Sequence, residues 1–267
     1  MRKNLSFFIV CLSVVAVASA AQVTDFYVIP AASHAPGANG TSWRTDMSIQ
    51  NIQSVPVVID IAVVESGEGL LDNVFSVTTV TVPAGGNMTL SDVLNNHRGR
   101  AQTTGALLVG GDHAFALTSR TYNATANGTL GQTVSASGDV ASDDSSTLYI
   151  PGLVQNGAFR TNVGLLMSAT SAPLTVMLTI NGANGSALGS RTFTVPAGAT
   201  THVQFPVTST APAPFDAGGA VVTVTGGIGT VIAYASVVDN FTGDASFISG
   251  GSAGPGGTSS LRQLLTR

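Results

Sequence analysis

Short runs of apolar and β-branched residues, separated by glycine, proline and asparagine, recur along most of the chain. In Phe75–Val82 apolar residues alternate with threonine, which is the period of a strand with one buried face. Leu90–Asn96 instead suggests a helical turn, for which Ser91 is a suitable N-cap. The pattern predicts strands at Val55–Val64, Phe75–Val82, Ala106–Val109, Ala114–Tyr122, Leu174–Ile180, Arg191–Val195, Thr201–Phe205, Ala220–Thr225 and Thr230–Val238.

Four segments of the chain recur in the same order, with offsets between 113 and 121 residues. A chain rich in valine, threonine and glycine can match itself by chance, but four collinear matches that include a scarce arginine favour duplication. The matches are Tyr27-Val28-Ile29-Pro30 with Leu148-Tyr149-Ile150-Pro151, Trp43-Arg44-Thr45-Asp46 with Phe159-Arg160-Thr161-Asn162, Val80-Thr81-Val82-Pro83-Ala84-Gly85 with Phe193-Thr194-Val195-Pro196-Ala197-Gly198, and Gly105-Ala106-Leu107-Leu108-Val109 with Gly219-Ala220-Val221-Val222-Thr223.

The strand spacing within each copy predicts the fold class. About seven short strands per copy, with turns every 8–12 positions or so, are typical of an immunoglobulin-like sandwich. We therefore expect an all-β protein of two tandem immunoglobulin-like antiparallel β-sandwich domains after a cleaved signal peptide. The predicted parts are a signal peptide (1–20), domain 1 (21–137), a linker (138–146), domain 2 (147–250) and a flexible C-terminal tail (251–267).

The N-terminus has the layout of a secretory signal. Arg2 and Lys3 precede the apolar run Leu5–Val17, and Ala18-Ser19-Ala20 supplies the small residues of a cleavage site. Cys11, the single cysteine, lies inside the apolar run, so the mature chain has none and depends on its core for stability. We expect a secreted protein, extracellular or periplasmic.

The longest uncharged stretch, Gly218–Val238, matches a membrane span in length. Its counterpart in the first copy carries Asp112, His113 and Arg120, which would be costly in lipid. We therefore interpret the stretch as two core strands joined near Gly226-Gly227, and we expect no integral membrane span.

The charge of the mature chain limits its partners. Without Arg2 and Lys3, the 10 basic residues fall to 8 against 14 acids, a net charge near −6, and the charged fraction is 9%. An acidic chain with no basic cluster argues against nucleic acid as a partner. We expect a protein or glycan partner at a cell surface and leave self-association open.

The order of elements resembles bacterial secreted immunoglobulin-like repeats of the cell-adhesion-related (CARDB-like) kind. The resemblance rests on Ser48-Ile49-Gln50-Asn51 before an apolar strand, on the Val-Pro-Ala-Gly turns, and on Ile29–Asp46, which is similar to a repeat of uncharacterised exported proteins. It covers most of both copies and implies extracellular display without implying an activity. The second copy lacks the Gly-Ala-Asn-Gly loop, so a role for that loop would belong to the first copy alone.

No combination of residues points to catalysis. The four histidines are scattered without metal-binding spacing, and Glu65 and Glu68 share one turn. Gly250-Gly251-Ser252-Ala253-Gly254 matches a nucleophile elbow formally, but it falls in the predicted tail rather than between a strand and a helix. We predict no catalytic residues and no enzyme.

Trp43-Arg44 is the sharpest candidate for ligand binding. Trp43 is the single tryptophan and follows a Gly-rich loop that contains Asn39, so it could stack on a sugar ring with Asn39 and Arg44 beside it. Because Phe159-Arg160 takes the same place in the second copy, a structural role is the competing interpretation. In that case the aromatic ring packs at a strand start and the arginine binds an acid or a carbonyl.

Calcium is the metal that suits the oxygen-rich loops. Asp239, Asn240 and Asp244 form the candidate site, and Asp139, Asp143 and Asp144 form another cluster. Neither cluster has a recognised loop spacing, and plain turn polarity is the alternative explanation. No other cofactor is predicted.

The leading hypothesis is a non-catalytic extracellular structural or interaction protein built from a duplicated β-sandwich, with cell adhesion as its context. The first alternative is a glycan- or surface-binding module that uses the Gly-rich loop of domain 1. The second alternative, a secreted hydrolase, has the least support.

Overall fold

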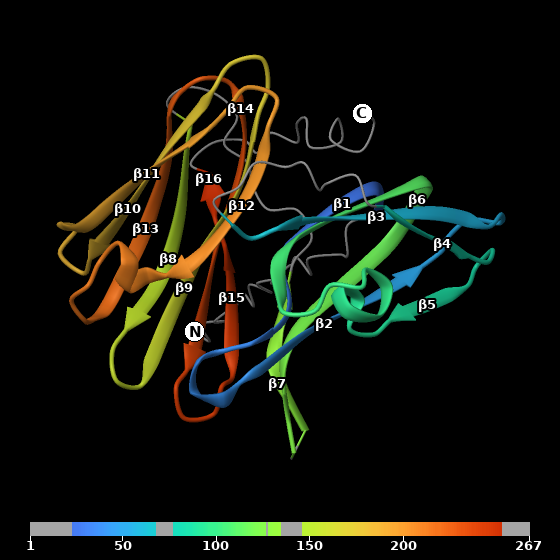
Figure 1. Cartoon of the computed structure of the whole chain (residues 1–267), viewed down its shortest axis with the longest axis horizontal. Coiled ribbons are helices and arrows are strands. Elements are labelled where there is room, and N and C mark those ends of the chain that lie inside the picture. Colours follow the sequence, from blue (N-terminus) through green and yellow to red (C-terminus); the bar gives the residue numbers. More distant parts are fainter. Residues whose placement is uncertain (1–22, 68–76, 127, 135–145, 253–267) are drawn as a thin grey trace, which may run out of the picture.

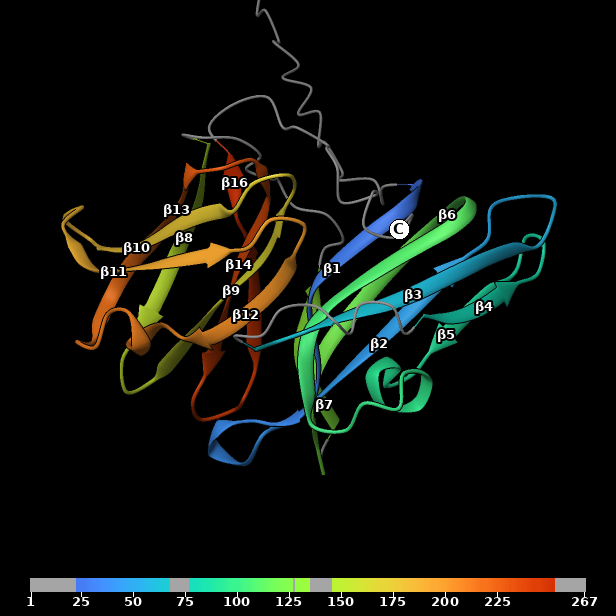
Figure 2. The same cartoon turned by 45° about the horizontal axis from the view of Figure 1, so that its top comes forward.

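In a computed structural model the described part of the chain is mostly antiparallel β-structure, as the sequence predicts (Figure 1). The structure describes residues 23–67, 77–126, 128–134 and 146–252. The predicted signal peptide, most of the predicted linker and the tail beyond Ser252 lie outside the described residues. Residues 23–134 and 146–252 form two halves that lie side by side in both views (Figure 2).

The second half is a sandwich of two sheets. One sheet has the strand order β11-β10-β13-β8-β16 and the other has the order β12-β9-β14-β15. The strands are β8 (Thr147–Gln155), β9 (Phe159–Ala169), β10 (Leu174–Gly182), β11 (Ala187–Val195), β12 (Thr200–Pro206), β13 (Phe215–Gly226), β14 (Gly229–Asp239), β15 (Ala245–Ser249) and β16 (Gly251–Ser252).

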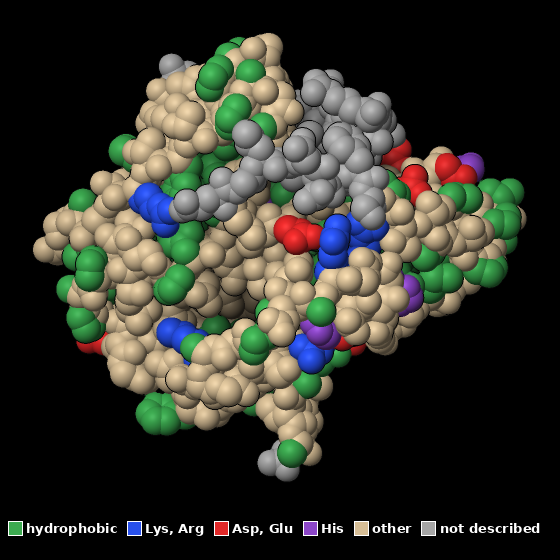
Figure 3. Space-filling view, in the orientation of Figure 1, with side chains coloured by type: hydrophobic (Ala, Val, Ile, Leu, Met, Phe, Trp, Pro, Cys, Tyr) green, Lys and Arg blue, Asp and Glu red, His purple; other side chains and the backbone are tan. Residues whose placement is uncertain are grey.

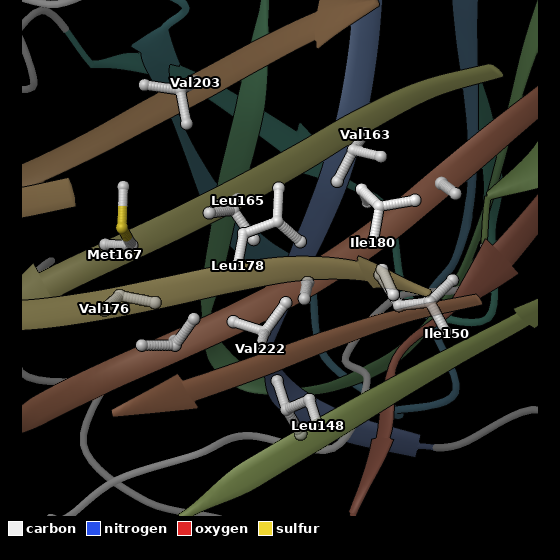
Figure 4. Packing of buried hydrophobic residues seen from close by; sticks show 14 of the residues in the cluster. Leu148, Ile150, Val163, Leu165, Met167, Val176, Leu178, Ile180, Val203 and Val222 are labelled. Atoms are coloured by element: carbon white, nitrogen blue, oxygen red, sulfur yellow. The ribbon is translucent and has the colours of Figure 1, made fainter. Parts of the chain in front are cut away.

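Alternating side chains of the two sheets fill the space between them (Figure 4). Since successive side chains of a strand point to opposite faces, apolar residues two positions apart share one face. This explains why the predicted strands contribute every second residue to the core. On β9 and β10 the buried residues of this core are Val163, Leu165, Met167, Ala169, Leu174, Val176, Leu178 and Ile180.

The first half has the same strand pairing, although its strands form one continuous sheet. The order is β4-β3-β6-β1-β2-β5, with β7 paired to the far part of β6. The strands are β1 (Val23–Pro36), β2 (Ser42–Gln50), β3 (Val57–Glu65), β4 (Thr78–Val82), β5 (Asn87–Leu90), β6 (Thr103–Thr125) and β7 (Gly128–Val134).

Strand β6 of the first half corresponds to β13 and β14 together. The first part of β6 pairs with β1 and β3, as β13 pairs with β8 and β10. The last part of β6 pairs with β2 and β7, as β14 pairs with β9 and β15. Trp43 lies opposite Asn123 on β6, and Phe159 lies opposite Asp239 on β14. Each residue of the second pair follows its counterpart in the first pair by 116 residues. The duplication therefore extends to the register of the strands.

The sequence predicts two separate strands, Ala106–Val109 and Ala114–Tyr122, with a hairpin turn at Gly110-Gly111-Asp112 between them, and that turn is wrong. The strand β6 continues through these residues, and Gly110 pairs with Phe26 on β1 and with Asp60 on β3. The pairing of β6 with β1 continues on both sides of these residues, because a register shift between Thr24 and Phe26 keeps the two strands side by side.

In the second half the corresponding connection, near Gly226-Gly227, passes from one sheet to the other instead of closing a hairpin. The interpretation of Gly218–Val238 as two strands is confirmed by β13 and β14. The predicted helical turn is a π-helical turn, η2 (Val93–His97), which follows Asp92 rather than Ser91. Among the described residues, none of the helices has the length and apolar character needed to cross a membrane.

A buried threonine explains the repeated Arg-Thr motif. The Thr45 hydroxyl donates to the Ser33 carbonyl and accepts from the Ser33 amide on β1. The Thr161 hydroxyl makes the same two bonds with Val154 on β8. Both threonines are fully buried. The motif therefore ties β2 and β9 to the strand that starts each half.

The two halves also share an apolar contact. Exposure alternates along the start of β3, but Ile61–Val64 are all buried. Ala62 and Val64 belong to a cluster that contains Leu166 and Ile232 of the second half, and the backbone amide of Gly67 donates to the His202 carbonyl. Strands β1, β3 and β6 are thus buried on both faces where the second half covers them.

Replacing Thr161 by valine tests the role of the repeated threonine. Thr161→Val keeps the shape but leaves two polar backbone groups of Val154 without their partner, so we expect the second half to lose about 1–3 kcal/mol of unfolding free energy. Urea unfolding followed by circular dichroism measures the change. The exposed Thr192→Val on β11 is the matched control and should stay within about 0.5 kcal/mol of the parent. Equal losses in both variants would contradict this role.

Candidate functional site

A cavity of about 290 Å³ lies where the two halves meet, and both halves line it. In the space-filling view the surface is hollowed between the halves (Figure 3). Half of the lining residues carry an amide or hydroxyl group, and most of the others are small apolar residues. Among the described residues the lining also holds two aromatic side chains, Trp43 and Tyr234, and one cation. The polar and aromatic side chains of its lining include Trp43, Gln132, Gln155, Arg160, Gln204 and Tyr234.

Trp43 reaches the cavity from the start of β2. It pairs with Ala35 at the end of β1, and the short 3-10 turn η1 (Ala38–Gly40) connects the two strands. Its indole lies directly on Gly37, where a Cβ atom would come within 2.4 Å of the Trp43 Nε1. Glycine is therefore required at 37 for the loop to pass under the ring. Trp43 packs at a strand start, as the structural interpretation predicts, and it still borders the cavity.

Arg44 does not join Trp43 at the cavity. Its Nη1 donates to the Trp43 carbonyl at 2.7 Å, and its Nε lies 3.3 Å from a carboxylate oxygen of Asp92. The same carboxylate binds the His34 Nδ1 at 2.8 Å. Arg44 thus has the acid and carbonyl partners of the structural interpretation.

Arg160, the counterpart of Arg44 in the second half, does line the cavity. Its Nη1 donates to the Asn240 Oδ1 at 2.9 Å. Burial lowers the pKa of the Arg160 guanidinium, and the nearby Asp239 carboxylate partly offsets that effect. The guanidinium stays cationic at neutral pH. The sequence signal for this residue was its place in the repeat, which by itself could not show the side of the molecule that it faces.

The loop of Asn39 and the turn of Asn240 come together beside the cavity, since Gly37 and Ala38 of the same loop line it. The Asn39 Nδ2 lies 3.5 Å from the Asn240 Oδ1. Gly243 approaches so closely that a Cβ atom there would be 2.7 Å from the Asn123 Nδ2. Two groups predicted separately from the sequence, the Gly-rich loop and the candidate calcium loop, are therefore neighbours.

The acidic residues of the candidate calcium loop stabilise its turn. The Asp239 Oδ1 accepts from the backbone amides of Phe241 and Thr242, and these bonds hold the pKa of Asp239 below its usual range. The Asp244 Oδ1 accepts from the Ala245 amide. Within residues 23–252, as far as they are described, no three His, Cys, Asp or Glu side chains are placed to share a metal ion. Calcium at Asp239, Asn240 and Asp244 stays a prediction, and Asp139, Asp143 and Asp144 lie outside the described residues.

A buried histidine network joins the two halves beside the cavity. His202 on β12 is 0% exposed. Its Nε2 lies 3.1 Å from the Pro30 carbonyl, which can only accept, so Nε2 carries the proton and Nδ1 accepts from the Ser66 hydroxyl at 2.6 Å. The Tyr234 hydroxyl lies 3.0 Å from Nε2 and donates to the Gln204 Oε1. The network joins both halves and ends at a residue that lines the cavity.

Ser66 and His202 have the spacing of a nucleophile and its base, but their surroundings do not suit that chemistry. Burial lowers the pKa of His202 to about 4, which makes it a weak base near neutral pH. Its second nitrogen faces a carbonyl and a phenol rather than the carboxylate that would stabilise an imidazolium. We therefore assign the pair to the contact between the halves.

No protein-family model and no curated protein matches the chain. Among solved structures, a cryo-EM structure of Broad Bean Stain Virus is 9% identical with a TM-score of 0.24, over 97% of this chain and 98% of that chain. A glycosyl hydrolase family 2 member from Bacteroides cellulosilyticus is 10% identical with a TM-score of 0.18, over 84% of this chain and 28% of that chain. A structure of the Gx strain of infectious bursal disease virus is 11% identical with a TM-score of 0.19, over 86% of this chain and 72% of that chain. These TM-scores support neither a shared fold nor a shared function, and the CARDB-like resemblance stays a prediction.

The His202 network predicts a pH-dependent stability. The folded state holds the imidazole neutral, whereas the unfolded state binds a proton below the ordinary pKa of 6.5. Stability from this group is therefore complete above pH 6.5 and is lost as the pH falls to about 4, a loss of about 3 kcal/mol. Urea unfolding at intervals between these pH values measures it.

Two variants separate this effect from the other titrating groups. His202→Gln should be less stable at neutral pH and should show a flatter pH dependence between 6.5 and 4, because the group that titrates is gone. His97→Gln, in the η2 turn, should keep the parent's dependence. An unchanged slope in His202→Gln would show that the buried imidazole is not its source.

Proposed function

We propose that the protein is a non-catalytic, secreted interaction protein made of two tandem immunoglobulin-like domains, and that it binds its partner in the cavity between them. The observation that carries the proposal is the cavity itself, which both halves line and which holds the predicted ligand-binding residue Trp43. A cleaved signal peptide at 1–20 would deliver the chain to an extracellular or periplasmic location.

The arrangement of strands supports the domain assignment. In the second half, the chain passes repeatedly between two antiparallel sheets, with β8, β10, β11, β13 and β16 in one and β9, β12, β14 and β15 in the other. The first half repeats the same pairings. Immunoglobulin-like domains share this sandwich architecture without always sharing one topology. The CARDB-like resemblance and a place at the cell surface belong to the same proposal.

The chemistry of the cavity supports binding over catalysis. Proton transfer needs a group that titrates near the working pH. Among the described lining residues the ionisable groups are the Arg160 guanidinium and the Tyr234 hydroxyl, and burial raises the pKa of Tyr234 well above its usual value. The amide and hydroxyl groups around them can orient a partner by hydrogen bonds.

Filling the cavity tests the proposal. Ala38 is exposed and lines the cavity from the η1 turn, so Ala38→Trp should occupy the space without disturbing either core. We expect the labelled mature chain to bind the surface of the producing cells, and we expect Ala38→Trp to weaken that binding about tenfold or more, because the partner and the indole compete for one volume.

Ala183→Trp is the matched control. Ala183 is exposed in the turn after β10 and does not line the cavity. This variant should bind the cells as the parent does, and thermal unfolding should show that both variants are folded. If Ala38→Trp binds as well as Ala183→Trp, the cavity is not the binding site.

A further inference from the structure

We infer that the cavity takes a saccharide that carries a carboxylate, with Arg160 on the acid group and Trp43 against a sugar face. This inference rests on the proposed function, because it names the ligand class of the same cavity. It follows from three features of the lining: its free hydrogen-bonding groups are donors, it holds one cation, and it includes a fixed aromatic ring.

The first feature is an excess of hydrogen-bond donors. The side-chain oxygens of three glutamines are already occupied: Gln132 accepts from Ser236, Gln155 from the Thr161 amide, and Gln204 from Tyr234. Within the described residues their NH₂ groups have no partner, and they are not sealed from solvent. Each glutamine is therefore held by its acceptor end while its donor end is available to a ligand.

The second feature is the single cation. Asn240 engages one nitrogen of Arg160, and no other hydrogen bond to its guanidinium occurs among the described residues. The remaining N–H groups are a fork suited to two oxygens of one carboxylate. Among the described residues no ion pair joins Asp239 to Arg160, and the Asp239 Oδ1 accepts from the turn amides.

The third feature is the ring of Trp43. The indole is fixed against Gly37 on one side, and it borders the cavity. An aromatic ring held in this way offers a flat apolar surface to the C–H face of a sugar, while amides and hydroxyls around it serve the ring oxygens. Flat aromatic bases could stack there too, but a nucleotide phosphate would meet one cation in a chain of negative net charge.

The size of the cavity agrees with a short saccharide. Its volume of about 290 Å³ is at the lower end of the range of roughly 300–1,000 Å³ that is usual for small-molecule sites.

Paired oligosaccharides test the inference. The probes are short oligomers of glucuronate, galacturonate and mannuronate, each compared with the same oligomer after its carboxylates are reduced to neutral alcohols. Trp43 is the single tryptophan, so its fluorescence reports binding directly. We expect at least one acidic oligomer to bind about tenfold or more tightly than its reduced form, because a charge-assisted pair to Arg160 is lost on reduction.

The repeat supplies the matched variants. Arg160→Gln should remove the preference for the acidic oligomer and leave the weak binding of the reduced form unchanged. Arg44→Gln changes the equivalent residue outside the cavity and should keep the preference in full. Thermal unfolding shows whether both variants are folded. Trp43→Phe should weaken the binding of the acidic and the reduced oligomers alike, and calorimetry replaces fluorescence for this variant.

Each outcome decides the matter. Equal affinity for acidic and reduced oligomers, an equal loss in Arg44→Gln, or no binding of any acidic oligomer would overturn the inference. If no acidic oligomer binds but Ala38→Trp still abolishes binding to the cells, the cavity is a binding site and the ligand class is wrong. If Ala38→Trp leaves cell binding intact, the proposed function itself fails.

Discussion

The imidazole of His202 extends from the second half of the molecule to the backbone of the first, and the cavity depends on that contact. One nitrogen faces the Pro30 carbonyl and the other accepts from Ser66, so the ring joins two strands of the first half to β12. Buried hydrogen bonds of this kind are strong when satisfied and costly when broken. Because Tyr234 and Gln204 continue the network to the cavity, the geometry of the lining follows from how the halves are joined.

The duplicated motif shows how one local structure serves two purposes. Thr45 and Thr161 make the same hydrogen bonds, which join β2 to β1 and β9 to β8. The arginine beside each threonine has a different environment. Asp92 holds Arg44 in the first half, whereas Arg160 lies at the junction with Asn240 as its partner. Buried residues that join strands within one half can thus be recognised from the repeat. The role of a surface residue depends instead on which residues of the other half lie next to it.

This distinction explains how much could be predicted from the sequence. Strand positions and the duplication were readable because side-chain alternation and turn residues are local signals. The continuity of β6 through Gly110 was not, since it depends on pairing with β1 and β3. The role of His202 was also hidden, because its partners are far away in sequence. One local signal for the junction did exist: the unbroken apolar run Ile61–Val64 is typical of a strand buried on both faces.

The cavity arises from the difference between the copies rather than from what they share. Between the proline and the arginine that both copies carry, the first copy, from Pro30 to Arg44, has five more residues than the second has from Pro151 to Arg160. Those extra residues form the η1 turn, which lies next to the Asn240 turn of the other copy and borders the cavity. Two copies of the second half would lack this loop, and a single copy of the first half would lack the opposite wall. A binding function at this place therefore requires both halves in their present order.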